Sequence, residues 1–147
     1  MIEKITKKHK TKLNSINEHP ILAFVDIHGH SRRKSVFMYG PYYPLHNDRH
    51  LRVRVIPKLL DDACDMFRYY SCKFKLEKSK MRTARIVLFK EFNIMNCYTL
   101  EASMYGYISQ QDRSTEHLSI LRLEEMGKEF GSSLHEYLRL IEEDKER

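Results

Sequence analysis

The sequence predicts one α/β domain in which helices flank a mixed β-sheet and a long helix closes the chain. Three observations lead to this prediction. An apolar run at residues 21–25 has the character of a buried strand. Apolar and charged residues alternate over residues 72–78, which is the period of a half-exposed strand. Apolar residues recur at helical spacing from Leu121 to about Glu143.

The remaining elements follow from local signals along the chain. Loosely spaced isoleucines and leucines indicate a lysine-rich helix over residues 2–16, which Pro20 ends. In order, we expect a strand at 21–28, loop over 29–50 interrupted by a strand at 35–38, a helix at about 57–67, a strand at 72–78, a helix from residue 84 and a strand at 98–101. Thr83 is placed to cap the helix at Ala84, although Ile86–Phe89 alone would favour a strand.

Composition limits the class of protein. The chain has 147 residues, of which 41% are hydrophobic and 31% charged, as in ordinary globular domains. No apolar stretch reaches the roughly 18 residues of a membrane span, so no membrane partner is expected. The three cysteines are odd in number and lack CxxC spacing, which favours a reducing cytoplasmic location. The net charge of +6 favours acidic partners, and aromatic residues are not interleaved with basic ones as nucleic-acid binding would require.

The first candidate site residue is His28, at the carboxyl end of the predicted strand 21–28. Ligands of open α/β sheets bind beyond the carboxyl ends of strands, so a histidine held there suits a metal. Asp26 is spaced to orient its ring. The alternative is a histidine that only packs or hydrogen-bonds at a strand end.

Two further candidates lie downstream. Glu101 ends the predicted strand at 98–101, where a carboxylate can act as a general base, or can be an ordinary surface glutamate. The second is a basic stretch, which is either a solvated face or a patch that recognises anions. Its members are Lys73, Lys75, Lys78, Lys80, Arg82 and Arg85. Arg85 precedes four apolar residues and is therefore the member we expect to be held rigidly.

Several blocks of the sequence together form a recognisable set of motifs. The longest is Asp26–Gly40, DIHGHSRRKSVFMYG. The others comprise Ser71–Lys75, Glu77–Lys80, Thr83–Arg85, Tyr98–Ser103 and Leu123–Gly127. In sequence and order these blocks, which cover about residues 20–140, resemble the cytosolic carboxypeptidases, zinc enzymes that trim glutamates from protein tails, tubulin above all.

The resemblance implies a role for each candidate. His28 resembles the third zinc ligand of the family, and Glu101 the general base that activates water. Arg85 resembles the residue of the specificity pocket that selects glutamate, with Lys80 as a further substrate-binding candidate and His30 as a pocket or support residue. The implied cofactor is Zn²⁺, with one of three expected protein ligands present. The implied partners are acidic protein tails such as tubulin, at a cytoplasmic location associated with microtubules or cilia.

Departures from the family pattern limit what this chain is expected to do alone. The family carries its first two zinc ligands in an upstream His-x-x-Glu motif, and no histidine here is followed three positions later by glutamate. Pro41 and Met81-Arg82 also differ from the common family residues. We therefore expect residues 1–19 to be a basic helical segment, 20–143 the C-terminal half of a catalytic domain, and 144–147 a charged tail. The alternative is a non-catalytic module that binds acidic tails.

Overall fold

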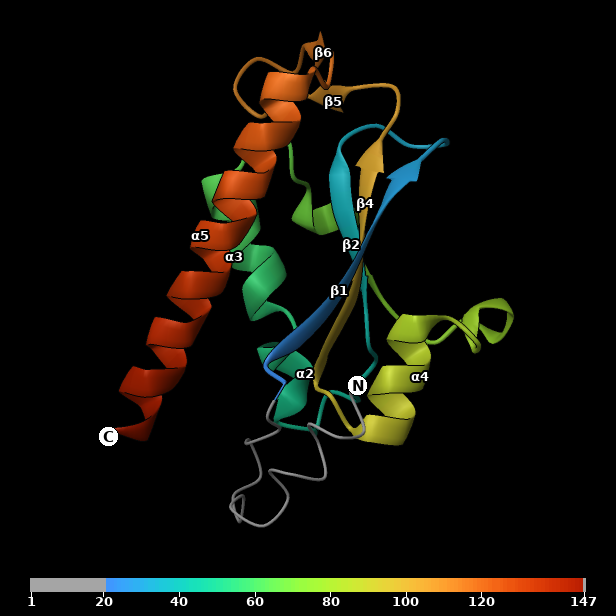
Figure 1. Cartoon of the computed structure of the whole chain (residues 1–147), viewed down its shortest axis with the longest axis vertical. Helices are drawn as coiled ribbons and strands as arrows, with labels where there is room; N and C mark the ends of the chain where they lie inside the picture. Colours follow the sequence, from blue (N-terminus) through green and yellow to red (C-terminus); the bar gives the residue numbers. More distant parts are fainter. Residues whose placement is uncertain (1–20, 147) are drawn as a thin grey trace.

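The computed structural model describes residues 21–146, which form a four-stranded mixed sheet with helices on both faces (Figure 1). The strands are β1 (Ala23–His30), β2 (Val36–Gly40), β3 (Lys73–Phe74) and β4 (Asn96–Ser103), in the order β1-β4-β2-β3. β1 runs parallel to β4, whereas β2 is antiparallel to β4 and parallel to β3. The predicted α/β fold with a mixed sheet is confirmed, and the predicted N-terminal helix lies outside the described residues.

The remaining elements connect and cover this sheet. They are α2 (Arg49–Arg52), α3 (Val55–Ala63), the 3₁₀ turns η2 (Tyr69–Ser71) and η3 (Lys78–Lys80), α4 (Ala84–Phe92), a hairpin of β5 (Tyr107–Ile108) and β6 (Thr115–Glu116), and α5 (Ile120–Lys145). In Figure 1, α3 and α5 lie on one side of the sheet and α4 on the other. No helix in the described part of the chain is long and apolar enough to cross a membrane.

The larger core lies between the sheet and the α3–α5 layer. Alternate strand residues point to this face, among them Val36, Met38, Tyr98 and Leu100. They pack against α3 through residues such as Leu60, and α5 contributes Met126 and Tyr137. The Ser119 side chain accepts a hydrogen bond from the Arg122 amide and so caps the start of α5.

A smaller core lies on the opposite face, beneath α4. Leu88 of α4 packs with Ile94 and Cys97, and Phe24 and Phe89 flank this cluster. The apolar run at Ile86–Phe89 is helical here, although its residues favour strands, because tertiary packing on the sheet overrides that preference. Asn93 ends the helix in the left-handed conformation at φ 54°.

Several element boundaries differ from the sequence prediction. β1 continues two residues beyond the predicted end, and β4 is eight residues long rather than four. The predicted strand over 72–78 shrinks to Lys73–Phe74, because its partner β2 ends at Gly40 and offers no further backbone to pair. The helix expected at 57–67 spans Val55–Ala63, and the last helix continues through Lys145, into the predicted tail.

A buried polar network ties β4 to its surroundings and yields a stability prediction. The Tyr98 hydroxyl lies 2.9 Å from both the Val53 carbonyl and Asn96 Oδ1, and Asn96 donates to the Tyr137 hydroxyl at 3.0 Å. Tyr98→Phe leaves these fully buried acceptors without a donor, which we expect to cost about 1–3 kcal/mol of unfolding free energy. Urea denaturation measures this loss. Tyr70→Phe, at a side chain that is 97% exposed, is the control and should change little.

Candidate functional site

The candidate site lies where the parallel strands β1 and β4 end together. His28 is the register partner of Glu101, and Glu101 is also the partner of Phe37 on β2. Register partners point to the same face of a sheet, so these three side chains lie on the face that α4 covers. The structure therefore brings the two principal predicted site residues together, although they are 73 positions apart in the chain (101 − 28).

The ring of His28 is oriented and exposed in a way that suits a metal ligand. Its Nδ1 atom lies 3.2 Å from Asp26 Oδ1, and its side chain is 47% exposed. A carboxylate at Nδ1 fixes the ring orientation and leaves Nε2 as the nitrogen that can bind a metal. The predicted contact with Asp26 is thus present. Within residues 21–146 no group of three or more histidine, cysteine or acidic side chains could hold a metal, so a zinc ion would need further ligands from elsewhere.

Glu101 lies deeper than His28 and beside a second histidine. Its side chain is 11% exposed, and Oε2 lies 3.6 Å from Nδ1 of His30, whose side chain is 18% exposed. His30 is expected to be a pocket or support residue, and in the structure it lies beside the candidate base. The period of a strand explains this placement: β1 includes residue 30, so His28 and His30 share one face.

Arg85 lies at the start of α4 and is 5% exposed. Its Nη1 atom donates to the Gly40 carbonyl at 3.1 Å, and its Nε atom has no partner in the described part of the chain. Burial lowers the pKa of the guanidinium, while Cys97, Glu77 and Tyr39, and then Glu101, act in the opposite direction. Arg85 is therefore a buried cation whose charge interacts with Glu101. Little of it is open to a ligand, so contact with a substrate requires neighbouring side chains to move.

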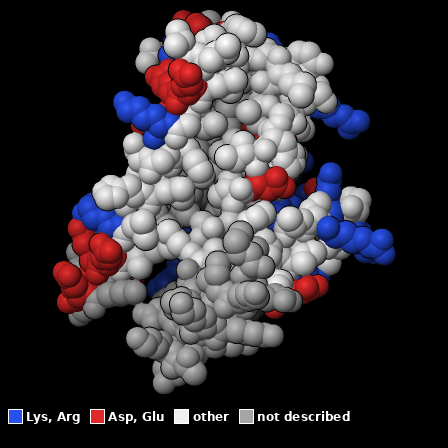
Figure 2. Space-filling model, viewed as in Figure 1, with Lys and Arg blue, Asp and Glu red and all other residues white. Residues whose placement is uncertain are grey.

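Lys80 and its basic neighbours form an exposed surface before α4. Figure 2 shows Lys and Arg side chains projecting over the η3 segment, where Lys78, Lys80 and Arg82 are exposed. Lys75 is paired with Glu77 at 3.1 Å, and the charges of Lys73 and Lys80 also act on Glu77. Lys78, Lys80 and Arg82 thus supply exposed positive charge in the segment that leads into α4.

Phe37, which the sequence analysis did not single out, and Arg33 pack beside the site residues. Phe37 contacts the His30 ring edge-on, with centroids 5.0 Å apart. Arg33 lies over the Phe37 ring at 4.3 Å and donates to the Ser71 carbonyl. The alternation of β2 could have indicated that Phe37 faces the site, but its contact with a histidine of β1 depends on the pairing of three strands.

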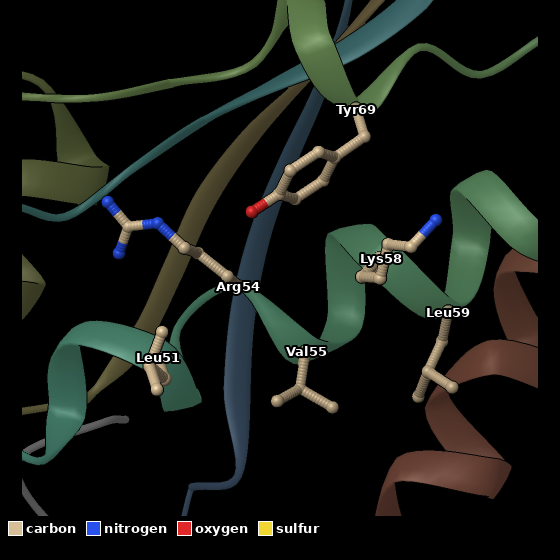
Figure 3. Close-up of a pocket in the computed structure, with 6 residues that line it drawn as sticks. All are labelled: Leu51, Arg54, Val55, Lys58, Leu59 and Tyr69. Atoms are coloured by element: carbon tan, nitrogen blue, oxygen red, sulfur yellow. The ribbon is translucent and has the colours of Figure 1, made fainter.

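A separate cavity lies outside this site, on the α3 side of the sheet (Figure 3). Its walls are mostly apolar and come from Leu51, Arg54, Val55, Lys58, Leu59 and Tyr69. Both cations already have partners, because Arg54 stacks on Phe74 and Lys58 pairs with Asp61 and Asp62. The cavity contributes no group to the chemistry at β1 and β4.

Comparison with known proteins identifies the family. The chain is 40% identical over 121 residues to cytosolic carboxypeptidase 2 of Danio rerio, covering 82% of this chain and 16% of that protein. It is 38% identical to cytosolic carboxypeptidase 3 of Bos taurus and 34% to cytosolic carboxypeptidase 1 of Mus musculus, covering 80% and 81% of this chain. The chain belongs to the cytosolic carboxypeptidase family. No family model matches it.

A solved structure supports the same fold. The metallo-carboxypeptidase from Burkholderia cenocepacia matches with a TM-score of 0.63 at 16% identity, over 81% of this chain and 31% of that one. The chain spans only a small part of its relatives, 12% of the bovine protein and 11% of the mouse protein. The activity, substrates and partners of these whole proteins are therefore only proposed for this chain.

The donor set of the site leads to a prediction about metal binding. If His28 is the single zinc ligand within residues 21–146, zinc should bind the 147-residue chain weakly and raise its melting temperature by less than about 2 °C. Calorimetric titration and thermal unfolding in zinc measure both. His28→Ala should remove the residual binding, whereas His46→Ala, in an exposed loop, should not. Tight stoichiometric binding that survives His28→Ala would contradict this assignment.

Proposed function

We propose that this chain forms part of a zinc metallocarboxypeptidase that removes C-terminal or side-chain-linked glutamates from acidic protein tails such as tubulin in the cytoplasm, at microtubules or cilia. The observation that carries the proposal is the register pairing of His28 with Glu101 on one face, at the carboxyl ends of two parallel strands. The family supports the reaction class, since relatives at 34–40% identity are named carboxypeptidases.

Each site residue has a defined part in this proposal. His28 is one zinc ligand, oriented by Asp26, and the other ligands come from outside the described residues. When bound, zinc supplies Lewis-acid polarisation of the scissile carbonyl and of water. Glu101 accepts a proton from water at its carboxylate and passes it to the departing amine. Its low exposure keeps this carboxylate out of bulk solvent and close to His30.

The charge around the site supports glutamate as the residue removed. Arg85 is a buried guanidinium on the same side of the sheet as Glu101, and guanidinium groups bind carboxylates through two parallel hydrogen bonds. Lys78, Lys80 and Arg82, in η3 and the turn that follows it, are exposed and come just before Arg85 in the chain. They would attract an acidic tail over a distance of about one Debye length.

A chimera tests this function. Residues 21–146 replace the aligned region of the Danio rerio cytosolic carboxypeptidase 2, so that the rest of the relative supplies the missing ligands. We expect the zinc-loaded chimera to release free glutamate from peptides with glutamate tails, and to act much less on peptides that end in leucine. A folded, zinc-loaded chimera that hydrolyses neither peptide would contradict the proposal.

The alternative is a non-catalytic module that binds acidic tails. The described residues hold one presented zinc ligand but an exposed basic surface, and this observation favours binding without hydrolysis. In that case the 147-residue chain should be a monodisperse monomer that binds glutamate-tailed peptides in a salt-sensitive manner. If the chain is instead part of an enzyme, we expect it to self-associate, because apolar side chains such as Ile27 (60% exposed) and Leu121 (76% exposed) are open to solvent.

A further inference from the structure

We propose that His30 is a positioning residue for Glu101, with the Nδ1–H edge of its ring directed at the Glu101 carboxylate. This assignment differs from a substrate-pocket role, in which His30 would face the ligand. A catalytic role for this contact rests on the proposed function. The contact itself involves only residues of this chain and can be tested without the reaction.

The first support is the placement of the two groups. His30 Nδ1 lies 3.6 Å from Glu101 Oε2, and the two side chains are 18% and 11% exposed. The separation is longer than a hydrogen bond, so the contact is an electrostatic one between two groups largely withdrawn from water. An N–H dipole at this distance, with little solvent to screen it, favours one orientation of the carboxylate.

The second support is the other ring nitrogen. His30 Nε2 is buried and has no hydrogen-bond partner in the described part of the chain. Among backbone groups, a buried N–H without an acceptor is rarer than a buried carbonyl without a donor, and we apply the same rule to the ring nitrogen. A proton on Nε2 would therefore be unfavourable, whereas a proton on Nδ1 points toward a carboxylate. Both observations select the same tautomer.

The third support is the packing that fixes the ring. Phe37 contacts the ring of His30 edge-on at 85°, and Arg33 covers the Phe37 ring. Phe37 is also the register partner of Glu101, so one aromatic ring adjoins both members of the pair. Arg33 is itself tied to the Ser71 carbonyl at 3.1 Å. The imidazole thus has neighbours that limit its rotation.

The same strand supplies an internal comparison. His28 and Asp26 form a second histidine–carboxylate pair, with Nδ1 and Oδ1 3.2 Å apart. That histidine is 47% exposed, whereas His30 is 18% exposed. In the exposed pair, the Nε2 atom of His28 does not contact Asp26 and can bind a ligand. In the buried pair, the Nδ1 atom of His30 lies next to the carboxylate of Glu101, the candidate base. The two histidines of β1 therefore have different tasks.

Nuclear magnetic resonance of the ¹⁵N-labelled 147-residue chain tests this inference without metal or substrate. Long-range ¹H–¹⁵N spectra, recorded above about pH 8.5, where an ordinary imidazole is neutral, distinguish the two tautomers. We expect His30 to be in the Nδ1–H form. Glu101→Leu removes the carboxylate and should cause loss of that form, with Glu101→Gln giving a smaller shift. Asp26→Asn is the matched control and should move the ring signals of His28 and leave those of His30 in place.

The reverse substitution reports on the carboxylate. His30→Phe keeps a ring against Phe37 but removes the N–H, so it should shift the side-chain carboxyl ¹³C signal of Glu101. His30→Asn returns a donor near the Nδ1 position and should restore part of that shift. The inference would be overturned if the wild type carried the His30 proton on Nε2. It would also be overturned if the His30 ring signals were the same in the folded wild type and in both Glu101 variants. A chimera without hydrolytic activity would leave this result unaffected, so the two proposals can fail separately.

Discussion

Glu101→Gln is expected to reduce turnover of glutamate-tailed peptides by the zinc-loaded chimera about 10²–10⁴-fold. The substitution keeps the size of the side chain and its place on β4, next to His30, but removes the group that accepts a proton from water. Zinc content and peptide affinity should stay near those of the parent, because neither depends on this carboxylate. Steady-state kinetics with metal analysis measures all three quantities.

A matched control separates this effect from general damage. Glu124→Gln removes a carboxylate from an exposed position on α5, away from the sheet, and should leave turnover unchanged. Retention of more than about a tenth of parental turnover by Glu101→Gln would show that another group serves as the base.

Arg85→Ala is expected to remove most of the preference of the chimera for glutamate over apolar C-termini. Loss of one partner of a desolvated charge pair typically costs about 2–5 kcal/mol, which corresponds to a large fall in turnover on glutamate peptides. Peptides ending in leucine should be affected much less, since Glu101 and the metal site remain. Arg85→Lys should recover part of the preference, because a single ammonium lacks the two parallel donors of the guanidinium.

The ratio of the two turnover rates is the informative quantity. Arg85 is buried and donates to the Gly40 carbonyl, so its removal also lowers stability and reduces both rates together. The ratio cancels that common loss. An unchanged ratio would show that Arg85 is not the selector, and the exposed cations Lys80 and Arg82 would become the next candidates.

Much of the fold could be predicted from local patterns. The long helix α5 follows from apolar spacing over more than twenty residues, and β1 follows from an apolar run after Pro20. The ends of the strands were harder to predict from the sequence, because they depend on the neighbouring strands with which they pair. β3 ends where β2 stops offering backbone, and β4 is long because β1 and β2 pair along both its edges. Neither fact is visible in a single segment.

The candidate site, like the fold, could be predicted from the sequence only in part. Residue chemistry and strand ends suggested His28, Glu101 and Asp26, and the family resemblance gave them roles. The register that makes His28 and Glu101 neighbours is a tertiary fact, as is the contact of His30 with Glu101. The apolar residues after Arg85 indicated that its side chain is held in place, but they did not indicate its burial or its hydrogen bond to the Gly40 carbonyl. The roles themselves stay predictions until the substitutions are measured.

The central claim is that His28 and Glu101 serve one reaction centre, and a double-substitution cycle in the zinc-loaded chimera tests it most directly. Turnover is measured for the parent, His28→Ala, Glu101→Gln and the double variant. Residues that act as a unit give non-additive losses. We therefore predict that the double variant is about as slow as the slower single variant. Losses that multiply, so that the double variant is slower by the product of both effects, would show that the two residues act independently and would contradict a shared centre.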